Sequence, residues 1–395
     1  MKARWMLLLA LTLPLVAAAA EQADDGFRPL FNGKDLSGWV NVNTAPSTWT
    51  VKDGTIICSG RPTGELRTDR MYQNFILELE WRHMRPKGNA GVFIWADDIT
   101  ARGVPFHRGI EVQVLENAYG KAKWFTTHGD IFPIHGARMR PLTGHNVGKA
   151  SARAFPTEER SKPCPNWNHY RITCNDGAIT LAVNGKVVTK GADAIPRKGY
   201  ICLESEGGIC HYRNLRIKVL PDTPIDPRHV AIADRGYRSL YTGVDLSGWA
   251  VAKDAKGHWK SSNWTFFYDG KGAADDASIA TEQDFADFGF LFDVRRKDTS
   301  KTTHIHLRGS DKAAIAIDPD DPVLGKHLAK GRGWSRFEGT LRGDRLSLTL
   351  NGHELFKDKP CPGVPARGPL RIVPAGPIDL ANVFVRQLKD PEPKP

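Results

Sequence analysis

The feature that most constrains the fold is an internal repeat. Residues 27–39 read FRPLFNGKDLSGW and residues 237–249 read YRSLYTGVDLSGW, so both contain the pattern R-x-L-x-x-G-x-D-L-S-G-W behind an aromatic residue. Further along each half, the same separation joins Trp167 to an Asn-Gly pair and Trp334 to a second Asn-Gly pair. Self-similarity over this distance predicts a tandem duplication of one unit in this 395-residue chain.

Each copy is predicted to be all-β. Short runs of Val, Ile, Leu, Phe and Trp alternate with Gly, Asn, Asp and Pro, and no long segment has the 3.6-residue period of a helix. The runs ITLAVNGKVV and LSLTLNGHELF carry Asn-Gly where a tight hairpin turn requires positive φ. We predict two tandem jelly-roll sandwiches of antiparallel strands, organised as follows: first sandwich 27–220, Pro-rich linker 221–228, second sandwich 229–389 and a loose Pro-rich tail 390–395.

The chain begins with a segment typical of a secretory signal peptide. Lys2 and Arg4 form a charged start, residues 5–16 are apolar, and residues 17–20 are alanines suited to cleavage. Loss of residues 1–20 removes two cations and lowers the formal net charge from +11 to +9 (11 − 2). We therefore expect a secreted or periplasmic protein without a membrane span.

The distribution of positive charge and the spacing of the cysteines argue against a nucleic-acid-binding protein and against a CxxC zinc or redox protein. Lys and Arg are scattered, and the densest run is residues 295–297, whereas a nucleic-acid site needs clustered cations with interleaved aromatics. The six cysteines include no CxxC pair, which argues against a zinc or redox motif of that type. Export permits disulfides, but six cysteines allow 15 pairings and the connectivity stays open.

The most informative stretch for chemistry is residues 89–117, NAGVFIWADDITARGVPFHRGIEVQVLEN. Residues 110–115 alternate polar and apolar side chains with the period of a half-buried strand. This alternation places Glu111 and Gln113 on one face and the valines beside them in a core. An acid and an amide on one face, near a second acid at Glu116, are candidates for catalysis or binding. The alternative is a solvated surface strand.

A long insertion, residues 118–163, interrupts the pattern of short strands. An irregular connection of this length inside a compact β domain is more often functional than filler. It contains His128, Asp130 and His135. The first two could form a catalytic or metal-binding pair, although His-Gly-Asp is more commonly a turn in which the aspartate accepts backbone amides.

Two tryptophans and two further glutamates complete the candidate set. Trp95 and Trp124 could stack on a sugar ring, although Trp95 lies on an alternating strand and could equally belong to the core. Glu204 and Glu206 lie two residues apart on a terminal strand and therefore share a face, which is either the site or a solvated edge.

The duplication supplies an internal comparison. Residues 111–113 (EVQ) align near residues 314–316 (AIA), and residues 204–206 (ESE) align with residues 373–375 (VPA). The framework residues are kept in the second copy while the polar face is lost. We infer that the first copy carries the chemistry and that the second is ancillary.

Five blocks in the first copy resemble, in order, those of the 3-keto-disaccharide hydrolase domain family: FNGKDLSGW, GNAGVFIW, GIEVQVLEN, WNHYRITCNDGAITLAVNGKVV, and GYICLESEGG followed by YRNLRIKVLP. The resemblance covers nearly all of residues 27–221, and the second copy resembles the same unit more weakly. It implies a concanavalin A-like jelly roll whose concave sheet presents the site. It also implies cleavage of 3-keto-glycosides, which a separate dehydrogenase has already oxidised at C3.

The implied chemistry explains which residues matter. A ketone at C3 acidifies the C2 proton, so a base can remove it while the glycosidic oxygen leaves C1, and water can add afterwards. Such a site needs a base, an acid or metal near the leaving oxygen, and donors for the enolate. The candidates fall into two groups, catalytic (Glu111, His128, Asp130, Glu204) and substrate-binding (Gln113, Glu116, Trp95, Trp124, His135, Glu206).

The sequence selects no cofactor. Carboxylate, amide and imidazole groups could hold Ca²⁺ or a transition metal that polarises the ketone, but no ligand spacing requires one. In the second copy, His304 and His306 share a strand face and could bind a metal or a sugar, although such pairs are more often structural.

Two other functions compete with this prediction. EVQVLE resembles the E-x-D-x-x-E strand of concanavalin A-like endo-glucanases, in which a β-bulge would bring Glu116 beside Glu111 as a retaining glycosidase pair roughly 5 to 5.5 Å apart. Gln113 replaces the central acid of that pattern and weakens the match. A non-catalytic carbohydrate-binding protein is the second alternative, and the clustering of acids and histidines in the first copy favours the enzyme.

Overall fold

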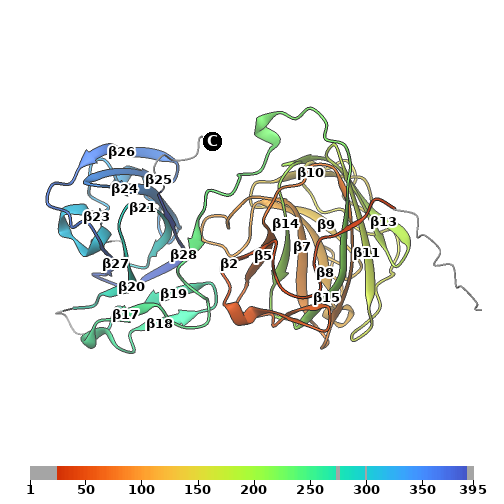
Figure 1. The fold of residues 1–395 in the computed structure, drawn as a ribbon, viewed down its shortest axis with the longest axis horizontal. Helices are drawn as coiled ribbons and strands as arrows, with labels where there is room; N and C mark the ends of the chain where they lie inside the picture. Colours follow the sequence, from red (N-terminus) through yellow and green to blue (C-terminus); the bar gives the residue numbers. More distant parts are fainter. Residues whose placement is uncertain (1–24, 273–275, 299, 389–395) are drawn as a thin grey trace, which may run out of the picture.

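The computed structural model describes residues 25–272, 276–298 and 300–388, and shows an all-β protein made of two sandwiches side by side (Figure 1). The predicted signal peptide and the predicted tail lie outside the described residues. No helix in the described part of the chain is long and apolar enough to cross a membrane. The helices there are short 3-10 turns: η1 Pro46–Thr48, η2 Asn117–Tyr119, η3 Pro227–His229, η4 Lys253–Ala255, η5 Leu307–Gly309, η6 Asp311–Ala313 and η7 Gly325–His327.

The first sandwich consists of a nine-stranded and a six-stranded antiparallel sheet. The nine-stranded sheet has the order β10 (Arg138–Pro141), β13 (Lys186–Ile195), β12 (Ala178–Val183), β11 (Asn168–Asn175), β6 (Phe75–His83), β15 (Cys210–Val219), β4 (Thr55–Cys58), β3 (Trp49–Lys52), with β1 (Arg28–Pro29) paired to β15. The six-stranded sheet has the order β2 (Trp39–Val42), β5 (Gly64–Thr68), β14 (Tyr200–Ser205), β7 (Asn89–Ala96), β8 (Gly109–Leu115), β9 (Ile131–Ile134).

The second sandwich consists of an eight-stranded and a five-stranded sheet, coloured from green to blue in Figure 1. The larger sheet has the order β18 (Trp259–Ser262), β19 (Thr265–Tyr268), β28 (Ile378–Gln387), β21 (Phe288–Arg296), β24 (Ser335–Arg342), β25 (Arg345–Leu350), β26 (His353–Pro360), with β16 (Arg238–Ser239) paired to β28. The smaller sheet has the order β17 (Trp249–Val251), β20 (Ile279–Phe285), β27 (Gly368–Val373), β22 (Thr303–His306), β23 (Ala314–Ile317).

Strand order in the two sandwiches supports the predicted duplication. The path β2-β5-β14-β7-β8 in the first sandwich has the same connectivity as β17-β20-β27-β22-β23 in the second. The path β3-β4-β15-β6-β11-β12-β13 likewise corresponds to β18-β19-β28-β21-β24-β25-β26. Equivalent positions in the two copies can therefore be read from the strand register.

The repeated D-L-S-G-W motif builds the same corner in each copy. In the first copy Asp35 Oδ1 accepts a hydrogen bond from the backbone N–H of Ser37 at 2.9 Å, and Gly38 adopts a φ of 86° that a side chain would disfavour. The buried Trp39 then donates its indole N–H to the carbonyl of Leu30 at 3.2 Å. The second copy repeats these contacts with Asp245, Ser247, Gly248, Trp249 and Leu240.

Both predicted Asn-Gly hairpins are present. Asn184 and Asn351 have φ values of 48° and 52°, and the glycine after each also has positive φ, as a tight turn requires. Each asparagine side chain also accepts a hydrogen bond from the strand beside it, from the N–H of His169 in one copy and of Arg336 in the other, both at 2.9 Å. The turns thus fix the register of three strands.

Polar side chains join the two sandwiches. Asn382 is 1% exposed, and its side-chain oxygen accepts hydrogen bonds from Asn43 and Thr100 at 2.7 Å each. Its amide nitrogen donates to the carbonyls of Ala101 and Val104 at 2.9 and 3.1 Å. A second contact lies nearby, where Arg235, which precedes β16, pairs with the buried Asp98, and these bonds hold residues 97–108 between the sandwiches.

Candidate functional site

Three neighbouring strands bring the candidate site together on the outer face of the six-stranded sheet. On β8, Val112 and Val114 are fully buried in the core, which confirms the predicted alternation and leaves Glu111 and Gln113 on the other face. Gly91 of β7 pairs with Gln113, and the β14–β7 register of Leu203 with Val92 puts the next residue, Glu204, opposite Gly91 on the other side.

Gly91 allows two carboxylates to approach each other across the central strand. A Cβ at this position would lie 2.9 Å from Glu111 Oε1 and 3.0 Å from Glu204 Oε2. These distances are shorter than ordinary van der Waals contact, so any side chain here would push the carboxylates away. The absence of a side chain at Gly91 therefore lets the two carboxylates lie close to each other over the backbone of β7.

The two carboxyl groups are buried and share one electrostatic environment. Glu111 is 6% exposed and Glu204 is 1% exposed. Burial, followed by the charge of Glu206, raises the pKa of Glu111 well above its usual range, and burial followed by the charge of Glu111 does the same for Glu204. Arg153 acts in the opposite direction on the pKa of Glu111. A pair of acids with raised pKa values suits proton transfer near neutral pH.

Glu206 joins the pair through a chain of amides. It follows β14 and accepts a hydrogen bond from the side chain of Asn89, whose own oxygen accepts one from Gln113 Nε2 at 3.1 Å. The same Gln113 nitrogen lies 3.3 Å from Glu111 Oε1. Burial raises the pKa of Glu206 to about 7, although the Asn89 hydrogen bond lowers it.

The long insertion contributes a cation to this face. Arg153 Nη1 donates to Gln113 Oε1 at 3.1 Å and to Asp130 Oδ2 at 3.0 Å, and the guanidinium lies 3.4 Å above the ring centre of Phe132. Asp130 is fully buried and also accepts the backbone N–H of Thr126 at 2.8 Å. Asp130 thus closes a turn and orients Arg153, and its catalytic role stays a prediction.

A cavity of about 540 Å³ opens beside Glu206 between the two sandwiches. Its wall in the first sandwich consists of residues 60–63, Glu206 and Gly207. Gly243, Val244 and Asn263 supply the wall from the second sandwich. The most solvent-accessible of the site carboxylates therefore faces a space large enough for a sugar ring.

The alternative pairing of Glu111 with Glu116, which required a β-bulge, does not form. The β7–β8 register runs without a bulge, and β8 ends at Leu115. Glu116 is 2% exposed and accepts the backbone N–H groups of Lys87 and Ala118 at 2.8 Å each, and that of Cys164 at 3.1 Å. Burial alone would raise its pKa, but these donors lower it below the usual value. These contacts give Glu116 a structural role and keep it from pairing with Glu111, and its predicted role in substrate binding stays a prediction.

Of the two positions that the sequence allowed for Trp95, sugar stacking and the core, the structure shows the core. Strand alternation would place it on the outer face with Gly91 and Phe93, but the β14–β7 register shifts between Tyr200 and Cys202 and Trp95 has a φ of 54°. This β-bulge turns the indole into the core, where it is fully buried and donates to the carbonyl of Gln73 at 2.9 Å.

His128 does not join the acids either. Its Nδ1 accepts the backbone N–H of Ser161 at 3.2 Å, and its Nε2 lies 3.5 Å from Glu159. Burial lowers the pKa of this imidazole. These contacts tie the insertion together, so the catalytic prediction for His128 is not supported by its position.

Two predicted substrate-binding residues lie at more exposed positions. Trp124 is 68% exposed and packs edge-on against Phe125, with ring centres 4.4 Å apart. His135 follows β9, and its ring stacks on that of Phe106 with ring centres 6.1 Å apart. Partial burial lowers the pKa of this imidazole, although the charge of Glu65 acts in the opposite direction. A role for either in substrate binding stays a prediction.

Sequence reasoning missed Gly91, Asn89 and Arg153. A glycine inside an alternating strand is a recognised sign of close approach and could have identified Gly91. Nothing local could have identified Arg153, because it reaches the site from 40 residues away in sequence along an irregular loop.

The second copy lacks these groups at equivalent positions. In the register of β22, β23 and β27, Ala314 and Ala316 take the places of Glu111 and Gln113, and Val373 takes the place of Glu204, as the sequence alignment predicted. His304 occupies the place of Gly91. The candidate site therefore belongs to the first sandwich.

The possible metal-ligand cluster in the described part of the chain is not the predicted histidine pair. Within the described residues, one set of three side chains brings its ligand atoms within 4.8 Å of one another, and it consists of Glu65, His107 and Cys202. His304 and His306 are not part of such a set.

Comparisons with known proteins match the part of the chain that forms the first sandwich. Residues 26–218 match the model of the 3-keto-alpha-glucoside-1,2-lyase-like domain. A 3-keto-disaccharide hydrolase of Bacteroides thetaiotaomicron is 24% identical over 241 residues, which span 50% of this chain and 79% of that protein.

The solved structures that align with this chain do so with TM-scores below 0.5. A crystal structure from Parabacteroides distasonis, described as a candidate glycosyl hydrolase, aligns with a TM-score of 0.40 and 22% identity over 52% of this chain and 98% of that chain. The carbohydrate-binding module CBM66 of Bacillus subtilis aligns with a TM-score of 0.33 and 13% identity over 46% of this chain and 95% of that chain.

Proposed function

We propose, from the premise that residues 26–218 of this chain are a domain of the 3-keto-disaccharide hydrolase family, that the first sandwich cleaves the glycosidic bond of 3-keto-glycosides. The observation that carries the proposal is the meeting of Glu111 and Glu204 across Gly91, on a face that the second sandwich has lost.

The two acids suit the two proton transfers of an elimination. The base takes the C2 proton, the C2–H electrons form the C1–C2 double bond, and the C1–O bond breaks while the acid protonates the leaving oxygen. Addition of water to the resulting enone would give net hydrolysis. These steps need no oxidant or reductant, because the ketone at C3 is already present in the substrate.

The surroundings of each carboxyl divide the roles. Burial and the negative charges of Glu206 and Glu65 raise the pKa of both carboxyls, but Arg153 opposes this at Glu111, whereas, among the described residues, the main charges that act on Glu204 include no cation. We therefore assign Glu111 as the base and Glu204 as the acid. Gln113 and Asn89, which already donate hydrogen bonds within the site, are placed to stabilise negative charge on the enolate.

The substrate requirement gives the function a direct test. Purified mature protein is incubated with a 4-nitrophenyl glucoside and, separately, with its 3-keto derivative, and nitrophenolate release is followed with and without a chelator. Release from the keto sugar alone supports the proposal. Release from the plain glucoside would support an ordinary glycosidase, and binding of the keto sugar without release would support a carbohydrate-binding protein.

The same proposal places the protein after an oxidation step. A separate dehydrogenase must supply the 3-keto sugar, because the proposed site removes a proton but no hydride. We also propose that the protein acts after export, on the basis of the N-terminal segment, and that the second sandwich supports the site rather than catalysing.

A further inference from the structure

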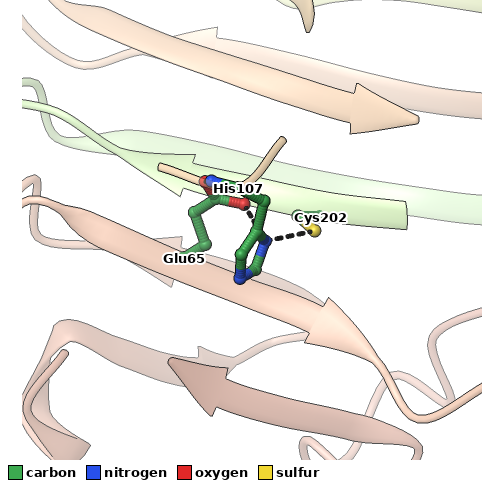
Figure 2. Close-up of side chains that lie close together, drawn as sticks. All are labelled: Glu65, His107 and Cys202. Atoms are coloured by element: carbon green, nitrogen blue, oxygen red, sulfur yellow. Dashed lines mark hydrogen bonds and ion pairs between the residues drawn. The ribbon is translucent and has the colours of Figure 1, made fainter. Parts of the chain in front are cut away.

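A buried group of three side chains lies on the same sheet face as the acids but outside the proposed reaction. His107 Nδ1 is 2.8 Å from Glu65 Oε2 and 3.2 Å from Cys202 Sγ (Figure 2). Glu65 lies on β5 and Cys202 on the adjacent β14, while His107 comes from the segment 97–108 that connects β7 to β8. All three residues are fully buried.

Two polar atoms of this group have unused bonding capacity. His107 Nε2 has no hydrogen-bond partner, and Glu65 Oε2 has none apart from its 2.8 Å contact with His107 Nδ1. Burial of a polar atom without a partner is unfavourable in a protein interior. Figure 2 shows the carboxylate oxygen and the sulfur both directed at one edge of the imidazole ring.

We propose that Glu65, His107 and Cys202 bind one divalent transition-metal ion of the Zn²⁺ class. A thiolate, an imidazole nitrogen and a carboxylate oxygen are the ligand types that Zn²⁺ takes. Their atoms already lie within 4.8 Å of one another, the separation that a single ion can bridge.

Charge balance favours a divalent ion here. One carboxylate and one thiolate carry two negative charges and the imidazole is neutral, so the complex with a divalent cation has no net charge. A neutral complex is what a fully buried position tolerates best. Binding converts the Cys202 thiol to a thiolate and releases one proton to solvent, and no electron is transferred.

The proposed ion would fix residues 97–108 onto the sheet beside the acids. Cys202 precedes Glu204 by two residues on β14, and Glu65 pairs with Glu204 across β5 and β14. The charge of Glu65 also contributes to the raised pKa of Glu111. A metal ion on Glu65 would therefore couple the position of this segment to the ionisation of the site.

The probe for this proposal is Co²⁺, which replaces Zn²⁺ and absorbs light. Full-length mature protein is freed of metal and titrated with Co²⁺, and the near-ultraviolet thiolate-to-cobalt band and the visible bands are recorded. We expect one Co²⁺ per chain and a thiolate band. Cys202→Ser should remove that band and weaken binding by more than about tenfold, whereas the matched buried-thiol control Cys174→Ser should keep both.

A measurement on the wild-type protein tests the same ligands without relying on the folding of a variant. X-ray absorption at the zinc edge of the wild-type, Zn²⁺-loaded protein should report one sulfur ligand with nitrogen and oxygen ligands. Absence of stoichiometric Co²⁺ binding, a thiolate band that persists in Cys202→Ser, or a zinc spectrum without sulfur would each overturn the proposal.

Discussion

At the scale of single residues, the environment of each carboxylate separates its role from those of its neighbours. Glu111, Glu116 and Glu204 are all buried glutamates. Glu116 is surrounded by backbone donors that hold it ionised, whereas Glu111 and Glu204 face each other across a glycine. Burial alone therefore does not identify a catalytic acid, and the partners of each carboxylate do.

Glu111→Gln should remove the proposed base while keeping its volume. We expect kcat on a 3-keto-glycoside to fall by roughly 10³-fold, with an unchanged unfolding midpoint or a raised one, because a buried charge is removed. The matched control is Glu80→Gln, on β6 of the other sheet. Near-normal activity in Glu111→Gln would exclude this residue from the mechanism.

Glu116→Gln tests the structural role of the third glutamate. The two oxygens of Glu116 accept three backbone N–H groups, whereas an amide has only one acceptor oxygen and leaves at least one of these donors unpaired. We therefore expect a loss of about 2 to 3 kcal/mol in the free energy of unfolding. Activity at a temperature where the variant is folded should stay within a few-fold of wild type. A loss of kcat as large as that of Glu111→Gln would instead support the glucanase-like mechanism in which Glu111 and Glu116 act as a pair.

Glu206 should make stability depend on pH. Its pKa is about 7 in the folded protein against 4.5 for the ordinary side chain, so the folded state holds the proton more tightly. Stability is then highest below pH 4.5 and is lost as pH rises through 7, by about 3 kcal/mol for this group.

Urea unfolding of the wild type and Glu206→Gln at pH 5 and pH 8 measures this effect. The variant should gain stability relative to wild type at pH 8 compared with pH 5. Equal differences at the two pH values would contradict the assignment of a raised pKa to Glu206.

At the scale of elements, one glycine in β7 sets the distance between the proposed base and acid. Gly91→Ala keeps an allowed backbone conformation but adds a Cβ within 3.0 Å of both carboxylates. We expect kcat to fall by about 10- to 100-fold with little change in folding. Gly289→Ala, inside β21 where the new Cβ meets only the flexible side chain of Arg386, is the control. Unchanged kcat in Gly91→Ala would show that the carboxylate spacing is not critical.

The alternation of β8 and the Asn-Gly hairpins could be predicted from sequence because both depend on local rules of strand period and turn geometry. For Trp95 the sequence left the core and sugar stacking both open, because strand alternation does not show the one-residue bulge opposite β14 that reverses the side to which it points. Arg153 could not be predicted, since an irregular loop carries no period that reports where its side chains return to the sheet.

At the scale of the whole molecule, the second sandwich is joined to the first through buried polar contacts around Asn382. Asp293 is fully buried nearby and accepts from the backbone N–H of Gly103 at 2.7 Å. These contacts hold the segment 97–108, which also carries His107. The second sandwich therefore contacts the segment that leads into β8, as its proposed supporting role requires.

Asn382→Asp tests this support with a nearly isosteric change. The variant places a carboxylate against Asp293 and removes the donor to Ala101 and Val104, so we expect a loss of at least about 3 kcal/mol in the free energy of unfolding. The exposed Asn166→Asp is the control, with a change near zero. A similarly small change in Asn382→Asp would mean that the sandwiches are only loosely associated.

The most direct test of the central claim is the isotope dependence of bond cleavage. A 4-nitrophenyl 3-keto-glucoside with deuterium at C2 is compared with the protiated sugar under single-turnover conditions. The proposed mechanism predicts slower nitrophenolate release from the deuterated sugar, and hardly any release from either sugar by Glu111→Gln. Equal rates for the two sugars together with full activity of Glu111→Gln would contradict removal of the C2 proton by this site.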